Sequence, residues 1–160
     1  MAKKPVTFTH NGAEQAGFTE DGQNLLDFLR REVGDLTPKY GCAQGTCGAC
    51  TVIVDGTPRL SCLTLAETVE GAHVETTGGL AGEGGLSVLQ TSFMEHFAAQ
   101  CGYCTPGMLM SATALLRENP NPTREEVIDG LSGNLCRCTG YEAIIEAVLA
   151  VARQSPRRSA

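Results

Sequence analysis

The sequence lacks the features that mark several classes of protein. It has no long basic run and a formal net charge of -6, so we expect no binding to nucleic acid, which depends on clustered Lys and Arg. No stretch reaches roughly 20 apolar residues, and no N-terminal stretch combines basic residues with an apolar run. We therefore expect no membrane span, no signal peptide and a cytoplasmic location.

Motifs of common catalytic and nucleotide sites are missing as well. The glycine-rich stretch 78–86 is not followed by Gly-Lys-Ser/Thr, so it does not predict a phosphate-binding loop. Ser, His and Asp occur without a nucleophile-elbow motif, which leaves hydrolase chemistry unsupported. His10, His73 and His96 are isolated from one another. Surface or packing roles are favoured for them over a Rieske-like pair of cluster ligands.

Cysteine, in contrast, is abundant, and its eight copies form two quartets with none left over. The first has the spacing C-x4-C-x2-C, with a fourth cysteine after eleven more residues, as in plant-type ferredoxins with one 2Fe-2S cluster. The second combines C-x2-C with C-x-C. In a reducing compartment such cysteines are expected to bind metal rather than to form disulfides. The first quartet is Cys42, Cys47, Cys50 and Cys62, and the second is Cys101, Cys104, Cys136 and Cys138.

The thiolate donors suit iron and sulfide. Four thiolates and two bridging sulfides satisfy both tetrahedral irons of a 2Fe-2S cluster. The glycines between Gly41 and Cys50 permit the positive φ values and the close backbone approach that a loop with three ligands needs. Zinc is the alternative, and the second quartet alone could bind it, whereas the first fits poorly because three ligands crowd into nine residues. A zinc-stapled interaction module thus stays open as a second hypothesis.

Strand and helix patterns fill the first half of the chain. Alternating residues around Asn11-Gly12 predict a β-hairpin, and Asp55-Gly56 marks a second one. Apolar residues at helical spacing from Asn24 to Val33 predict one amphipathic helix, and residues 73–76 can form a last strand. This pattern indicates a small mixed sheet wrapped around one helix.

The second half has a helical pattern only. Ser87 and Thr123 are good N-caps, and further helices are expected over 107–118 and 142–153. Both cysteine pairs of the second quartet then fall in loops between helices. The chain is therefore expected to have an α+β fold with two domains. Their predicted bounds are 1–77 for the first domain, 78–86 for a glycine-rich linker and 87–160 for the helical domain.

Three motifs make a specific resemblance to a known family. The segments Gly41–Val52, Gln100–Gly107 and Gly133–Tyr141 are similar to those of the iron-sulfur subunit of the molybdenum hydroxylases, the xanthine oxidase family. The likeness runs from the first hairpin to the last helix. It implies a ferredoxin-like β-grasp domain and a C-terminal four-helix bundle, each with one 2Fe-2S cluster. It also implies a large molybdopterin-binding subunit and a medium FAD-binding subunit as partners, in a heterotrimer or a dimer of heterotrimers.

The resemblance assigns roles to particular residues. The C-terminal cluster would face the molybdopterin and the N-terminal cluster the FAD, so that single electrons pass between them and the chain itself has no catalytic residue. Gln100 and Cys138 would also contact the pterin. Ala43 stands where many relatives have glycine. The alternatives are the same role in an aromatic acyl-CoA reductase of this family, or a free-standing ferredoxin-like carrier.

Overall fold

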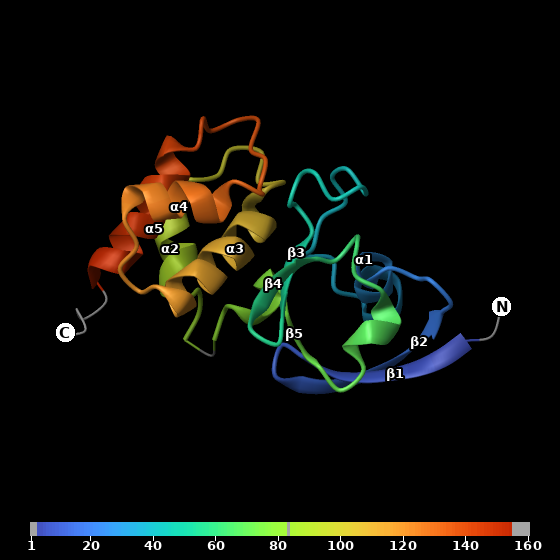
Figure 1. Ribbon diagram of the computed structural model, residues 1–160. Helices are drawn as coiled ribbons and strands as arrows, with labels where there is room; N and C mark the ends of the chain where they lie inside the picture. Colours follow the sequence, from blue (N-terminus) through green and yellow to red (C-terminus); the bar gives the residue numbers. More distant parts are fainter. Residues whose placement is uncertain (1–2, 83, 155–160) are drawn as a thin grey trace.

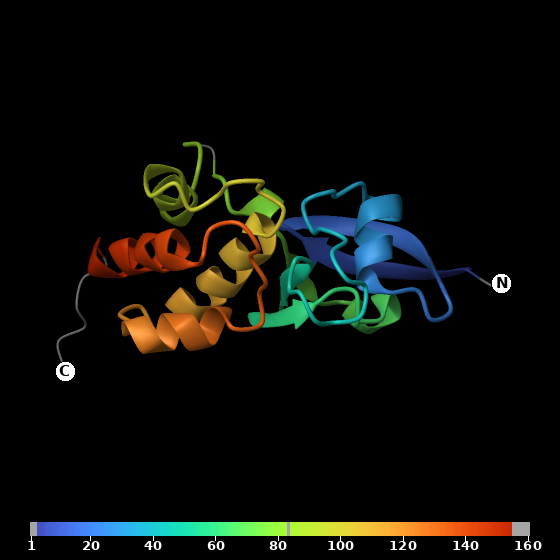
Figure 2. The same cartoon turned by 90° about the horizontal axis from the view of Figure 1, so that it is seen from above.

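The computed structural model describes residues 3–82 and 84–154, and it consists of a mixed sheet followed by helices (Figure 1). The part with the sheet and the part with the helices lie side by side, and both views show this arrangement (Figure 2). The α+β expectation is confirmed. Within the described residues, no helix has both the length and the apolar character to cross a membrane.

Two hairpins form the sheet where the sequence predicted them. Asn11 and Gly12 join the first pair of strands with φ values of 50° and 86°, and Asp55 and Gly56 join the second pair with φ values of 47° and 78°. Two successive positive φ values are typical of the turn that matches the twist of a two-residue hairpin. The strands are β1 (Lys3–His10) with β2 (Ala13–Glu20), and β3 (Thr51–Val54) with β4 (Thr57–Leu60).

A short strand, β5 (His73–Glu75), joins the two hairpins into one sheet. The strand order is β2-β1-β5-β3-β4, with β5 parallel to β1 and antiparallel to β3. β5 is thus the central strand of the sheet although it is the last of the five strands along the chain. The strand ends one residue before the predicted segment does.

One helix packs on a face of this sheet. α1 (Leu25–Phe28) continues as the π-helical turn η1 (Leu29–Val33), and Gly34 ends it in the left-handed conformation. The side chain of Asn24 caps α1 by accepting a hydrogen bond from the backbone of Asp27. The apolar face of the helix is buried against strand residues. The core contains Val6, Phe8, Leu25, Phe28, Leu29, Val52, Val54, Ala66, Val69, Ala72 and Val74.

Four helices pack around a second core. Ser87 and Thr123 begin α2 and α4 as the sequence predicted, each in a capping box. α3 starts at Thr105, earlier than predicted, because Pro106 fits the first turn of a helix. The helices are α2 (Val88–Glu95), α3 (Thr105–Glu118), α4 (Arg124–Leu131) and α5 (Glu142–Gln154).

Two single turns of 3-10 helix were not predicted. One is η2 (Ala66–Val69), whose buried residues belong to the core of the sheet. The other is η3 (Thr77–Gly79), which begins where the glycine-rich linker was expected. Leu80 follows η3 and packs against the helical core. Turns this short leave no hydrophobic period in the sequence, so tertiary packing decides where they form.

Candidate metal centres

The first cysteine loop needs glycine at a point of close approach. A Cβ atom added to Gly41 would lie 2.5 Å from the Sγ atom of Cys47, so any larger residue at this position would displace the sulfur. Gly45 and Gly48 have φ values of 81° and 68°. Ala43 also has a positive φ of 54°, which explains why glycine suits this position better. The loop thus curls tightly around its cysteines, as predicted.

The thiols of the first quartet lie in two contacting pairs. Cys42 interacts with Cys47, and Cys50 interacts with Cys62. The second pair is buried and the first is partly exposed. The backbone N–H of Thr46 donates to the Sγ atom of Cys42 at 3.3 Å. Backbone hydrogen bonds of this kind stabilise a negative charge on sulfur and help to set the potential of a cluster.

Two thiols of the first quartet, one from each pair, differ in the charge they favour. Hydrogen bonds from the Thr46 side chain and from the backbone of Gln44 and Thr46 lower the pKa of Cys42 to about 6. Burial and the neighbouring thiol of Cys50 raise the pKa of Cys62 to about 11. Because metal binds thiolates, metal binding at Cys62 would release a proton.

The second quartet is built from two loops between helices. Cys101 and Cys104 lie before and at the start of α3, and Cys136 and Cys138 lie between α4 and α5. They again form two pairs, with 3.6 Å between the sulfurs of Cys101 and Cys138 and a contact between Cys104 and Cys136. Cys101 and Cys138 are exposed, whereas Cys136 is buried.

The buried side of this quartet shows opposite pKa shifts within one pair. Burial and the neighbouring Cys136 raise the pKa of Cys104 to about 12. Burial also acts on Cys136, but hydrogen bonds led by the Thr139 side chain outweigh it and lower the pKa of that thiol. The Oγ1 atom of Thr139 is 3.1 Å from the sulfur of Cys136. Cys136 therefore loses its proton more readily than Cys104 and is the first of the two to become the thiolate that binds metal.

The arrangement of both quartets fits a 2Fe-2S cluster. Two contacting pairs in each quartet supply two thiolates for each of two irons. Among the described residues, no three His, Cys, Asp or Glu side chains gather as ligands of a single metal ion. A groove between the halves is lined by members of both quartets, which brings the candidate centres together. These members are Cys42, Cys47, Cys101, Cys104, Cys136 and Cys138.

The remaining residues singled out in the sequence lie in different surroundings. Gln100 is exposed beside Cys101, on the side of the second quartet that faces outward. His10 and His96 are occupied by hydrogen bonds, to the carboxylate of Asp35 at 3.0 Å and to the backbone of Ser92 at 2.9 Å. These two histidines therefore have structural roles in the fold.

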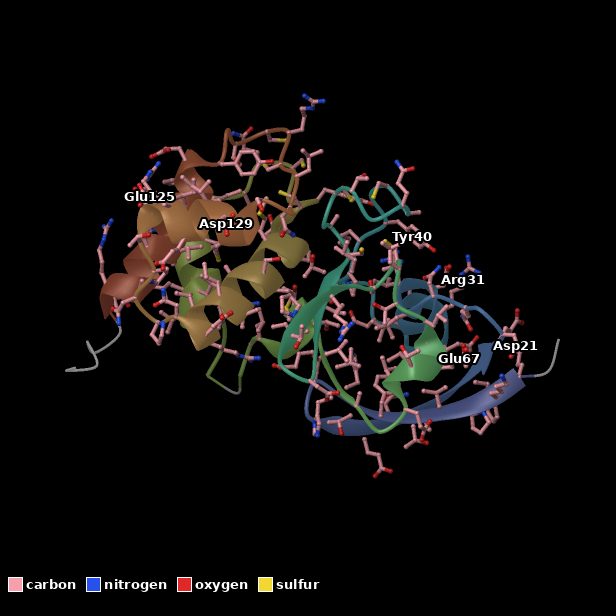
Figure 3. The ribbon with its side chains drawn as sticks, viewed as in Figure 1. Asp21, Arg31, Tyr40, Glu67, Glu125 and Asp129 are labelled. Carbon is pink, nitrogen blue, oxygen red and sulfur yellow. The ribbon has the colours of Figure 1, made fainter. Side chains whose placement is uncertain are left out.

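Sequence analysis overlooked two residues between the quartets. The hydroxyl group of Tyr103 donates a hydrogen bond to the carbonyl of Tyr40. Tyr40, which is labelled in Figure 3, precedes the first cysteine loop. Asn134 is buried with 4% exposure and bonds to the same loop. Both lie within or beside the motifs that surround the cysteines. Their polar side chains next to the cysteines were the only signal in the sequence. Their hydrogen-bond partners are distant along the chain, so no local pattern identified them.

Comparison with known proteins identifies the family. A model of the 2Fe-2S iron-sulfur cluster binding domain matches residues 8–81, and a model of the [2Fe-2S] binding domain matches residues 68–149. The chain is 51% identical over 139 residues to the nicotine 6-hydroxylase small subunit of Paenarthrobacter nicotinovorans, covering 87% of this chain and 84% of that protein. This chain belongs to the iron-sulfur subunits of the molybdenum hydroxylases. It is a subunit of an oxidoreductase and is not catalytic alone.

Two further relatives agree with this family. The nicotinate dehydrogenase small FeS subunit of Eubacterium barkeri is 47% identical over 148 residues, which cover 92% of this chain and 94% of that one. The crystal structure of quinoline 2-oxidoreductase from Pseudomonas putida 86 contains a similar chain, with a TM-score of 0.92 and 49% identity over 94% of both chains. The predicted resemblance is confirmed.

Proposed function

We propose that this iron-sulfur subunit relays single electrons between a molybdopterin centre and FAD on partner subunits. The observation that carries the proposal is the presence of two cysteine quartets, of which six members line one groove. When bound, two 2Fe-2S clusters would supply reversible one-electron chemistry. The proposed ligands are Cys42, Cys47, Cys50 and Cys62 for one cluster, and Cys101, Cys104, Cys136 and Cys138 for the other.

The two parts of the fold are the proposed units of this relay. The sheet wrapped around α1 supports a β-grasp domain over residues 1–77, and the common core of α2 to α5 supports a four-helix bundle over 87–160. Residues 78–86 would link them. Each unit would hold one cluster, because each contains one quartet.

Exposed apolar residues on the helical part of the chain are evidence for an interface with partner subunits. Met94 on α2 and Phe97 just after it are 66% and 83% exposed and line one groove, and such exposed apolar surface is typical of interaction sites. The relatives named above are themselves small subunits. We propose a heterotrimer or a dimer of heterotrimers with a large molybdopterin-binding and a medium FAD-binding subunit, located in the cytoplasm. The exposed Gln100 and Cys138 would contact the pterin.

Cofactor analysis of the complex purified through this chain tests the proposal. We expect iron, molybdenum and flavin in one complex, and two distinct paramagnetic signals after reduction with dithionite. A chain that elutes alone with iron would contradict the partner assignment. A colourless chain with stoichiometric zinc would contradict the electron-transfer role itself.

The pterin contact has a separate test in Gln100→Ala. We expect this variant to lose molybdopterin or turnover and to keep its iron, because the side chain is exposed next to the second quartet rather than packed under it. Gln44→Ala is the matched control, since Gln44 is an exposed glutamine beside the other quartet. Normal molybdopterin content and turnover in Gln100→Ala would show that the contact is absent.

A further inference from the structure

Asn134 joins the two cysteine loops from a buried position. Its Nδ2 atom donates to the carbonyl oxygen of Gly48 at 3.0 Å, and its Oδ1 atom accepts a hydrogen bond from the hydroxyl of Ser111 at 2.7 Å. Nδ2 also lies 3.4 Å from Oγ1 of Thr51. The amide thus connects the first cysteine loop, α3 and the loop of the second quartet.

The chemistry of its partners determines the orientation of this amide. The carbonyl of Gly48 can only accept, so the amide nitrogen has to face it. The oxygen then faces Ser111, whose hydroxyl donates. A carboxylate of the same shape would place an acceptor against the Gly48 carbonyl, and an unpaired buried acceptor is costly. Asparagine is therefore matched to this site in a way that aspartate is not.

The backbone segments around Asn134 pack so closely that two glycines among them have no room for a side chain. A Cβ atom on Gly48 would lie 2.4 Å from the carbonyl oxygen of Gly133, and one on Gly107 would lie 2.2 Å from the carbonyl oxygen of Gly48. Both clashes are with backbone atoms, which cannot rotate away. The first cysteine loop and the start of α3 are therefore in direct backbone contact.

The residue after Asn134 connects two ligand positions. The backbone N–H of Leu135 donates to the carbonyl of Cys47 at 2.8 Å, and the next residue is Cys136. The backbones of one cysteine from each quartet are therefore linked through a single hydrogen bond and one intervening residue. Asn134 is adjacent to Leu135, so its bond to Gly48 and the bond from Leu135 to Cys47 join the same two loops at neighbouring residues.

We infer that Asn134 is a positioning residue that fixes the two cysteine loops relative to each other around the Leu135–Cys47 hydrogen bond, and so would fix the separation of the clusters bound in them. The inference depends on the proposed function, because it assumes a cluster in each quartet. Clusters bound in the two quartets would exchange one electron along this connection, so that one would be oxidised and the other reduced, with no atom or proton exchanged. The hydrogen bonds of the Asn134 side chain go to Gly48, Ser111 and Thr51, so it would act on the cysteines through the backbone.

Electron paramagnetic resonance of the dithionite-reduced complex tests the inference. Two reduced clusters at a fixed, short separation split each other's signals at low temperature, and we expect this splitting in the unmodified complex. In Asn134→Asp the splitting should narrow or disappear, while the iron content and the signal of each cluster at higher temperature stay unchanged. In Ser111→Ala, which leaves the bond to Gly48 in place, we expect a smaller narrowing.

The control and the contradicting results are distinct from those of the proposed function. Asn121→Asp makes the same chemical change at an exposed position before α4 and should keep the full splitting. The inference is overturned by an unsplit spectrum in the unmodified complex or by wild-type splitting in Asn134→Asp. If Asn134→Asp does not retain both clusters, wild-type splitting in Ser111→Ala overturns it. Loss of a cluster signal from the unmodified protein would instead contradict the relay.

Discussion

Both quartets consist of four cysteines, but the fold brings their cysteines together in different ways. Three cysteines of the first lie within nine residues, in a loop whose shape follows from local glycines. Those of the second come from two loops, one before α3 and one before α5. The first quartet is therefore largely a property of one segment, whereas the second exists only when the helices have packed.

Exposure separates the quartets further. In the first, one pair is buried and the other is partly covered, whereas in the second Cys101 and Cys138 are both exposed. Since burial and hydrogen bonds to sulfur set the potential of a cluster, the two centres are expected to differ in potential. An exposed pair also gives a partner subunit direct access to the second centre.

The largest expected effect comes from removing one ligand from either quartet. Cys47→Ser should abolish the signal of the first cluster and leave that of the second, and Cys136→Ser should do the reverse, because each set of thiolates serves its own cluster. Each variant should lose about half of the iron. Iron analysis and paramagnetic resonance check this. Loss of both signals from either change would refute two independent sites.

A weakened helical core should affect the second quartet alone. Ile144 on α5 is 1% exposed in the same core as Cys136, so Ile144→Ala should lower the free energy of unfolding of the helical part by about 3 kcal/mol. We expect the second signal to decline first on warming. Ile128→Ala is the control, since Ile128 is 48% exposed on α4. Equal loss of both signals would show that the halves are not separable.

Acid should weaken the part with the sheet through Asp35. Burial alone would raise the pKa of this carboxyl, but hydrogen bonds from His10, Thr76 and Thr37 outweigh it and hold the pKa well below its usual range. A lowered pKa adds stability above the unfolded-state value near 3.9, and this stability is lost as the pH falls through the folded-state value. Asp35→Asn should therefore cost about 2 kcal/mol near neutral pH and flatten the acid dependence of unfolding.

Denaturant unfolding from neutral to acidic pH measures this effect. Asp129→Asn is the matched control, because Asp129 is an exposed carboxylate on α4, in the other half of the molecule (Figure 3). The control should keep the wild-type pH dependence. If the free energy of unfolding of Asp35→Asn falls with acid as steeply as that of the wild type, the carboxylate does not stabilise the fold.

The smallest effect is expected at Ala43 in the first cysteine loop. Its φ of 54° strains an alanine by about 1 kcal/mol, and glycine would relieve this at the cost of a more flexible unfolded chain. Ala43→Gly should thus be neutral or stabilising by up to about 1 kcal/mol. The control is Ala99→Gly, an exposed loop alanine without a positive φ, which should be destabilised. The measurement is the melting temperature of each variant. An equal drop in melting temperature for both variants would show that the backbone of Ala43 is not strained.

Local features of the sequence predicted most of the fold. The caps at Ser87 and Thr123 and both two-residue turns lie where the pattern placed them, because a cap or a turn depends on a few adjacent residues. The turns η2 and η3 escaped prediction, since they are single turns stabilised by distant contacts. The assignment of the eight cysteines as cluster ligands stays a prediction, supported by their spacing and their pairing.

The sequence alone was enough to indicate the family and to predict two quartets of thiolate ligands, because spacing along the chain limits which cysteines can share a centre. Tertiary structure alone decided which thiols form contacting pairs, which of them are exposed, and that Asn134 joins Gly48 to Ser111. These contacts connect residues far apart in the chain. Their geometry depends on how α3 packs against β3, which no local pattern encodes.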